Sequence, residues 1–168
     1  NDPNKMWAAS VSGGIFYSPN RGRSWLVIDD MMDNLAVVSL AQAANGDIYA
    51  GTGEDMYYFA SGAGSGGIRG AGIFKSTDGG QTFAQIPSTD PANNPNQGWD
   101  AVGKIEADPT DANRIYAATS AGLKVSDDAG VSWTDAGLSS NITRDLHITP
   151  SGTVYAKVGT RIWKSTSG

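Results

Sequence analysis

Apolar residues along this chain fall in short runs, and each run is bounded by Gly, Pro, Asn, Asp or Ser. Four runs share the order turn residue, spacer, aliphatic, aromatic and Ala, at Asn4–Ala8, Gly46–Ala50, Asn113–Ala117 and Gly152–Ala156. This order predicts a short strand that leaves a turn. Because no segment repeats its apolar residues every 3.6 positions over the length of a helix, we expect β-strands throughout.

A second pattern recurs downstream of these strands, at Ser18–Trp25, Ser76–Phe83 and Ser126–Trp133, and a fourth copy begins at Ser165. Asp or Asn at its third position can accept hydrogen bonds from a tight turn, and Gly at the fifth can adopt a positive φ. A hydroxyl residue at the seventh position closes the turn, and an aromatic residue at the eighth anchors the outgoing strand. We interpret the unit as a structural hairpin built from Ser18, Asn20, Gly22, Trp25, Ser76, Asp78, Gly80, Phe83, Ser126, Asp128, Gly130 and Trp133.

Each repeat therefore consists of a strand, a turn, a strand, a loop, a strand, a hairpin and a strand. Four antiparallel strands in every ~40–50 residues are typical of a propeller blade. The predicted fold is all-β, a β-propeller segment of antiparallel four-stranded blades at 1–34, 35–99, 100–141 and 142–168. The two central blades are expected to be complete and the outer two partial. Since propellers have ~4–8 blades, we expect the ring to continue in the same or another chain.

Composition narrows the classes of function. The 168 residues suit one domain, and 22 Gly with only 17% charged residues suit many short strands. A net charge of −5 argues against nucleic acid and anionic membranes as partners. Without Cys, and with His147 as the one histidine, a thiolate or multi-histidine metal site is excluded, and we expect no cofactor. No apolar run is long enough to span a bilayer, and a start at Asn1 suggests a mature or excised segment.

Two long irregular stretches are expected on the same face of the propeller, opposite the hairpins. Thr52–Gly70 expands the second blade, and Pro87–Gly98 is the next connection on that face. Long loops often carry function, and these two should be neighbours. Aromatic planes beside charged groups suit sugar or peptide recognition. The expected ligand- or partner-binding residues are Glu54, Tyr57, Tyr58, Phe59, Arg69, Trp99 and Asp100.

Other chemistry has weaker support in the sequence. A glycosidase needs two carboxylates ~5–9.5 Å apart, for which Glu54 or Asp55 with Asp100 is the one pairing to nominate. The acidic stretch 108–113 lacks the Gly and the distal Glu of an EF-hand and is interpreted as a turn. We interpret His147 as a core or channel residue, and Asn141–Thr143 as a glycosylation sequon only in a source that glycosylates.

The repeated hairpin resembles the Asp-box, or bacterial neuraminidase repeat. Gly51–Glu54, the Gly-rich loop after it and Gly72–Phe83 resemble in particular the sortilin-like and xyloglucanase-like propellers of secreted bacterial proteins. The resemblance covers essentially the whole chain and implies a fold more than a chemistry, because Asp-box proteins include sialidases, endoglucanases, receptors and assembly factors. The box at Ser18 departs from the family pattern, since Asn20 stands in place of Asp.

The leading hypothesis is a non-catalytic binding or scaffold segment of a secreted or cell-surface bacterial propeller. It would present the loops 52–70 and 87–99 to a glycan or a protein. One alternative is part of a xyloglucanase- or sialidase-like glycoside hydrolase whose catalytic residues lie partly outside this chain. Another is an assembly factor of a larger protein complex.

Overall fold

The protein is described from a computed structural model, which covers residues 2–54, 67–138 and 142–165. This part of the chain contains short strands and one turn of 3₁₀ helix, η1 (Pro87–Thr89). The strands are β1 (Met6–Ser10), β2 (Gly14–Ser18), β3 (Leu26–Ile28), β4 (Val37–Gln42), β5 (Ile48–Thr52), β6 (Ile73–Ser76), β7 (Ala84–Gln85), β8 (Val102–Ala107), β9 (Ile115–Thr119), β10 (Gly122–Ser126), β11 (Thr134–Asp135), β12 (Thr143–Ile148), β13 (Val154–Val158) and β14 (Arg161–Ser165).

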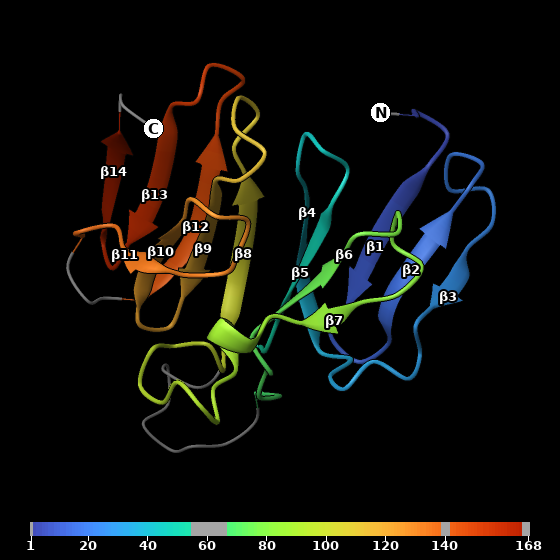
Figure 1. Ribbon diagram of the computed structural model, residues 1–168, viewed down its shortest axis with the longest axis horizontal. Coiled ribbons are helices and arrows are strands. Elements are labelled where there is room, and N and C mark those ends of the chain that lie inside the picture. The colour runs from blue at the N-terminus through green and yellow to red at the C-terminus, as the bar shows by residue number, and fades with distance from the viewer. Residues whose placement is uncertain (1, 55–66, 139–141, 166–168) are drawn as a thin grey trace.

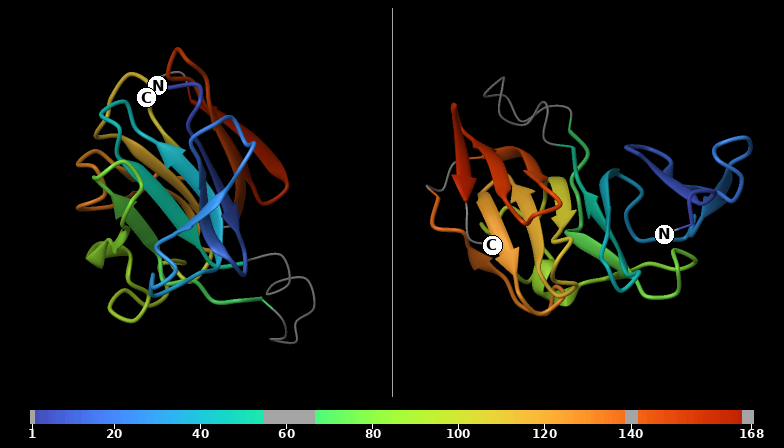
Figure 2. Two further views of the ribbon diagram at one scale, coloured as in Figure 1. Left: turned by 90° about the vertical axis from the view of Figure 1, so that its right-hand side faces the viewer. Right: turned by 90° about the horizontal axis from the view of Figure 1, so that it is seen from above.

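The strands form four antiparallel sheets in chain order. The first sheet contains β1–β2–β3, the second β4 to β7, the third β8 to β11 and the fourth β12–β13–β14. The sheets follow one another around an arc, with β4, β8 and β12 as neighbouring inner strands (Figures 1 and 2). This arrangement confirms the predicted all-β propeller segment, with two four-stranded sheets between two that have three strands in the described part of the chain.

The second strands of the two central sheets explain why the repeated aliphatic–aromatic–Ala pattern does not alternate with polar residues. All five residues of β5 and all five of β9 are buried. A strand that is covered by a sheet on both of its faces becomes apolar or small at every position. Tyr49 and Ile115 are fully enclosed in this way.

The hydrophobic core lies between the sheets rather than within one of them. The interface between the first and second sheets buries Ile15, Val37, Ile48, Ala50, Phe74 and Phe83. The next interface buries Tyr49, Ile73, Ile86, Trp99, Val102, Ile105, Ile115 and Ala117, with Trp133 packed against them. The third buries Tyr116, Ala118, Leu123, Leu146, Ile148, Val154, Ala156 and Val158. Stacking of sheets through such contacts is the reason that a single blade cannot fold alone.

The hydrogen bonds expected in the repeated hairpin are present, as the second sheet illustrates. The hydroxyl of Ser76 donates to Asp78 Oδ1 at 2.7 Å and accepts from the amide of Gly80 at 2.8 Å. The hydroxyl of Thr82 donates to Asp78 Oδ2 at 2.7 Å. Gly80 has a φ of +84°, as the reversal requires. The hairpin is therefore a self-contained turn whose polar groups satisfy one another.

The other two hairpins repeat this network. Asp128 accepts from the hydroxyl of Ser126 at 2.8 Å and from the amide of Ser132 at 2.8 Å. Asn20 takes the same place in the first sheet, and its Nδ2 donates to the hydroxyl of Ser24 at 2.9 Å. The amide side chain reverses the direction of one hydrogen bond but keeps the turn. The fourth copy begins at Ser165, the last residue of β14, and its remainder lies outside the described residues.

The short helical turn η1, which follows β7, was not predicted from the sequence. Thr89, at the end of this turn, is completely buried, and its hydroxyl accepts a hydrogen bond from the amide of Ile73 at 2.9 Å. The same hydroxyl donates to the carbonyl of Ile86 at 2.9 Å. The hydroxyl of Thr89 thus bonds β6 where a neighbouring strand would otherwise do so. This role could not be predicted locally, because Ile73 lies 16 residues away in the sequence.

Candidate functional site

The two long loops are neighbours, as the order of the strands requires. The amide of Gly70 donates to the carbonyl of Asp100 at 2.9 Å, and the amide of Gly72 donates to the carbonyl of Trp99 at 3.0 Å. At the other end of the expanded loop, the amide of Glu54 donates to the carbonyl of Ile68 at 2.9 Å. The described ends of segment 52–70 therefore lie against the start of the third sheet.

Close backbone contact at Gly53 makes this arrangement possible. Its φ is +98°, and a Cβ atom at this position would lie 2.3 Å from the carbonyl oxygen of Asp100 and 2.7 Å from the amide nitrogen of Gly70. Only a residue without a side chain can bring three backbone segments so close together. Gly53 thus fixes where the expanded loop leaves β5.

A cleft of about 460 Å³ opens where these loops meet. It is lined by Arg69, Pro91, Asn94, Pro95, Asn96, Gly98, Trp99, Asp100, Ser120 and Ala121. The residues come from the expanded loop, from the connection between the second and third sheets, and from the turn between β9 and β10. The volume lies within the range of small-ligand pockets, roughly 300–1,000 Å³.

The polar groups of the cleft can both donate and accept hydrogen bonds. Arg69 is exposed, and its carbonyl is held by the side-chain amide of Asn34 at 2.9 Å. Asp100 is half-buried, and its Oδ1 lies 3.4 Å from the hydroxyl of Ser120. Asn96 lies on the same lining with a φ of +65°, a conformation that Asn adopts more readily than most residues.

Asp90 braces the loop that forms one wall of the cleft. Its carboxylate accepts from the amide of Ala92 at 2.9 Å and from the side chain of Asn93 at 2.5 Å. Its carbonyl accepts from the amide of Asn94 at 2.9 Å. These bonds hold a stretch that is poor in regular structure, so the wall of the cleft has a defined shape.

Trp99 has a different role from the one expected of an exposed recognition residue. Only 3% of its surface is exposed, and its ring meets that of Trp133 edge to face at 5.2 Å. It belongs to the core between the second and third sheets. The expectation that Trp99 offers its ring to a ligand is therefore corrected: the residue borders the cleft, but its ring is packed in the core.

The remaining expected residues divide into three groups. Arg69 and Asp100 line the cleft, whereas Glu54 is half-buried and stands outside the set of residues that line it. Asp55, Tyr57, Tyr58 and Phe59 lie outside the described residues. Asn94 and Asn96 lie in the nominated loop 87–99 but were not singled out from the sequence. Ser120 was missed, although its turn emerges on the same face as the two long loops.

The part of the chain that the structure describes contains no arrangement of side chains suited to metal binding or to histidine chemistry. No group of three His, Cys, Asp or Glu residues is placed there to hold a metal ion. In the turn 108–113, Asp108 Oδ1 accepts from the amide and the hydroxyl of Thr110, both at 2.7 Å. His147 is exposed on β12, so it is not a core residue; that it lines the channel stays a prediction.

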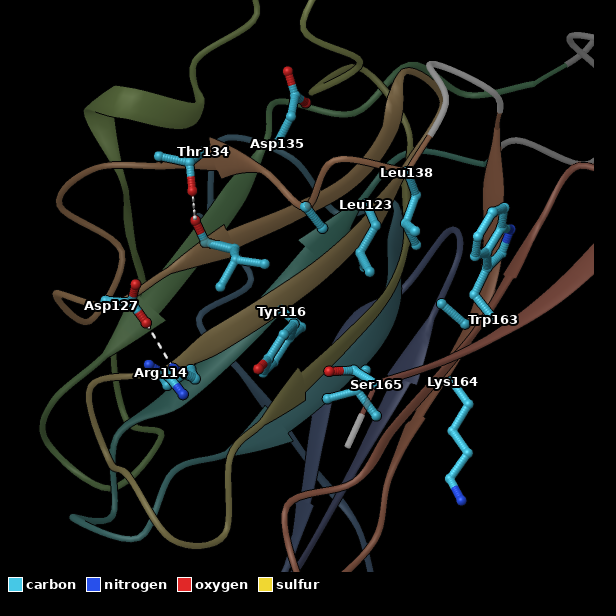
Figure 3. Close-up of a pocket in the computed structure, with 14 residues that line it drawn as sticks. Arg114, Tyr116, Leu123, Asp127, Thr134, Asp135, Leu138, Trp163, Lys164 and Ser165 are labelled. Atoms are coloured by element: carbon cyan, nitrogen blue, oxygen red, sulfur yellow. Dashed lines mark hydrogen bonds and ion pairs between the residues drawn. The ribbon is translucent and has the colours of Figure 1, made fainter. Parts of the chain in front are cut away.

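A second cavity, of about 400 Å³, lies between the third and fourth sheets (Figure 3). Its walls include Tyr116, Leu123, Val154 and Ala156, and Arg114 and Asp127 form an ion pair of 2.6 Å at one side. By strand register these four wall residues correspond to Tyr49, Ile73, Ile115 and Ala117, the cluster on which Trp133 packs. We therefore regard this cavity as space between blades and not as a ligand site.

Comparison with known proteins finds no matching family model and no matching curated protein sequence. Solved structures do match. A GH74 xyloglucanase from Xanthomonas campestris has 18% identity and a TM-score of 0.68, over 96% of this chain and 25% of its own. YCF48 bound to D1 peptide has 21% identity and a TM-score of 0.67, over 99% of this chain and 50% of its own.

The extracellular domain of a hybrid two-component system protein from B. thetaiotaomicron is also similar, with 14% identity and a TM-score of 0.68. It is matched over 100% of this chain and 20% of its own. The chain thus spans half or less of the structures to which it is similar. The described residues contain no helix that is long and apolar enough to cross a membrane. Identities this low show the fold alone, and that fold is the β-propeller.

Proposed function

We propose that this chain is a non-catalytic binding segment of a secreted or cell-surface bacterial β-propeller, and that the cleft beside Arg69 and Asp100 recognises a glycan. The observation that carries the proposal is that Arg69, Asn96 and Asp100 all line one cavity. Asn94 lines it too, although its side-chain amide donates to the carbonyls of Pro87 and Asp90. Sugar hydroxyls donate and accept hydrogen bonds in turn, and paired charged and amide groups suit them.

The similar solved structures suggest the first ligand to test. GH74 xyloglucanases are among the similar structures, and extracellular bacterial domains are another group. The hairpins at Ser18, Ser76 and Ser126 support classification as Asp-box repeats of the sortilin-like or xyloglucanase-like kind. Xyloglucan oligosaccharides are therefore the first probes, with other plant and bacterial glycans after them.

Calorimetric titration tests the proposal. Arg69→Ala and Asn96→Gly, which removes an amide but keeps the positive φ of 65°, should each weaken binding about tenfold, or ~1.4 kcal/mol. Arg23→Ala is the matched control, because Arg23 is an exposed guanidinium on the hairpin of the first sheet. Absence of glycan binding by the unsubstituted chain, or equal losses for all three variants, would count against the cleft.

The hydrolase alternative has its own readout. Hydrolysis would be favoured over simple binding if the chain released new reducing ends from xyloglucan. This release should then be lost in Asp100→Asn but kept in Arg23→Ala. Glu54 is the second carboxylate to substitute, because a glycosidase requires two across the scissile bond. Binding without release of reducing ends supports the non-catalytic proposal.

A protein partner is the second candidate, favoured by the similarity to YCF48 bound to D1 peptide over 99% of this chain. An extended peptide could also satisfy the amides and charges of the cleft. Titration with D1 peptide distinguishes the two candidates. If the chain binds the peptide, Arg69→Ala weakens that binding and no glycan binds, the ligand of the cleft is a peptide and not a glycan.

A further inference from the structure

One stretch of the cleft wall, residues 95–97, lies between two anchored residues. On one side, the backbone amide and the side chain of Asn94 both donate to the carbonyl of Asp90, at 2.9 and 3.2 Å. On the other side, Gly98 has a φ of +78°, and a Cβ atom there would lie 2.4 Å from the amide nitrogen of Ala121. The two ends of the stretch are therefore fixed.

The middle of this stretch is held by one side-chain hydrogen bond. Lys124 Nζ donates to Gln97 Oε1 at 3.0 Å. In the part of the chain that the structure describes, this is the one hydrogen bond made by residues 95–97. Asn96 and Gly98 line the cleft, whereas Gln97 between them stands outside its lining and meets Lys124 instead. The position of Asn96 therefore depends on what holds Gln97.

Lys124 is only 4% exposed, which is rare for a lysine. It lies on β10, and its Nζ also donates to Asp135 Oδ1 at 2.6 Å, across the strand pair of β10 and β11. The side chain of Asp135 is largely exposed, with 69% of its surface accessible. A buried ammonium group needs hydrogen-bond acceptors, because an unpaired charge is costly to bury. Lys124 thus takes its counter-charge from the sheet and a second acceptor from the loop.

These two acceptors tie the loop to the interior of the third sheet. β10 pairs with β9, and all five residues of β9 are buried. The side chain of Lys124 is enclosed with this sheet. If Gln97 moved away, Nζ would lose an acceptor at a site that water scarcely reaches, and this loss opposes motion of the loop. Asn96 is held on the cleft wall for the same reason.

We propose that Lys124 is a positioning residue of the cleft: by holding Gln97, it fixes Asn96 in the orientation in which a ligand meets its amide. This role rests on the proposed function, since it concerns ligand binding in the same cleft. Lys124 stands outside the lining of the cleft. Its effect on affinity should therefore pass through Gln97.

Backbone relaxation by nuclear magnetic resonance tests the hold on the loop without any ligand. In Lys124→Met, the order parameters of the Asn96 and Gln97 amides should fall from about 0.85, the value of rigid backbone, towards about 0.6. Gln97→Met should give the same fall and leaves the buried lysine in place, so it decides the matter if Lys124→Met does not fold. Unchanged order parameters in the folded variants would overturn the proposal.

The matched control is Lys104→Met, the same substitution in the same sheet. Lys104 lies on β8, pairs with Glu106 at 3.3 Å and stands outside the lining of the cleft. Its removal should leave the order parameters of Asn96 and Gln97 as they are. An equal fall in this variant would mean that any change in the sheet loosens the loop, which would also overturn the proposal.

Titration with xyloglucan oligosaccharides, and with D1 peptide as the second probe, tests the effect on recognition. Lys124→Met and Gln97→Met should each weaken binding about tenfold. The double variant should lose no more than either single variant, because both changes break the same contact. Gln97→Glu keeps the acceptor oxygen and should retain the affinity. Additive losses would show that Lys124 acts through the fold and not through Gln97.

The two proposals can fail separately. If neither probe binds the unsubstituted protein, the proposed function fails, and the order parameters decide whether Lys124 holds the loop. If a probe binds and Arg69→Ala weakens its binding, whereas Lys124→Met and Gln97→Met do not, the cleft is a binding site that Lys124 does not position.

Discussion

The hydroxyl of Tyr49 donates a hydrogen bond of 3.2 Å to the carbonyl of Ala129 and so joins the second sheet to the hairpin of the third. The tyrosine is fully enclosed, and burial raises the pKa of its hydroxyl, which keeps it a neutral donor. The contact spans 80 residues of sequence. It is one of the bonds through which neighbouring blades recognise one another.

Tyr49→Phe should lower the free energy of unfolding by about 0.5–1.5 kcal/mol, the usual net value of one hydrogen bond. Urea denaturation measures the loss. Tyr17→Phe provides the comparison, because the rings of Tyr17 and Trp7 contact each other at a tilted angle, with centroids 5.3 Å apart, and this contact survives the change. Equal losses in both variants would show that the Ala129 bond adds nothing.

Gly53→Ala should disrupt the meeting of the two long loops. The new Cβ would lie 2.3 Å from the Asp100 carbonyl, so backbone segments must move apart, and we expect a loss of more than about 3 kcal/mol. Gly46→Ala is the control for conformation alone: its φ is +95° with open space around it, and it should cost about 1–2 kcal/mol. Thermal unfolding of both variants gives the comparison.

Trp99→Ala should destabilise the protein rather than only weaken ligand binding. Removing a buried tryptophan from the core costs about 3–5 kcal/mol, and Trp99 is 3% exposed. Trp25→Ala, at a position that is 41% exposed, should cost about 1 kcal/mol. If Trp99→Ala kept full stability and lost binding, the tryptophan would be a recognition residue after all.

Asp128 should make the third hairpin sensitive to acid. The hydroxyl and the amide of Ser132, followed by the hydroxyl of Ser126, lower the pKa of Asp128 from 3.8 to about 2. Its folded pKa is depressed, so its contribution to stability is complete above pH 3.8 and is lost as the pH falls towards about 2. Asp128→Asn should flatten the pH dependence of unfolding in that window, as followed by urea denaturation.

The first hairpin offers a natural control for this pH effect. Asn20 holds the same turn without an ionisable group. Asn20→Asp should therefore add acid sensitivity in the same window, while the stability near neutral pH changes little. A pH profile that is unaffected by both substitutions would mean that the carboxylate interacts equally in the folded and unfolded chain.

The repeated motifs predicted the fold because their interactions are local. The network of Ser76, Asp78 and Thr82 closes within seven residues, so its chemistry can be deduced from spacing alone. Strand order then follows, since each hairpin and each tight turn joins neighbouring antiparallel strands. The neighbourhood of the loops 52–70 and 87–99 could be predicted from this order for the same reason.

By itself, the sequence determined the hairpins, the four-strand repeat and the face on which the long loops emerge. Only the tertiary structure decided which loop residues line the cleft. Trp99 and Asp100 are adjacent in sequence and both border the cavity, yet the ring of Trp99 is buried against Trp133, whereas Asp100 is half-buried beside Ser120. A side chain's environment depends on the neighbouring sheet that packs against it, and the sequence of a loop does not encode that neighbour locally.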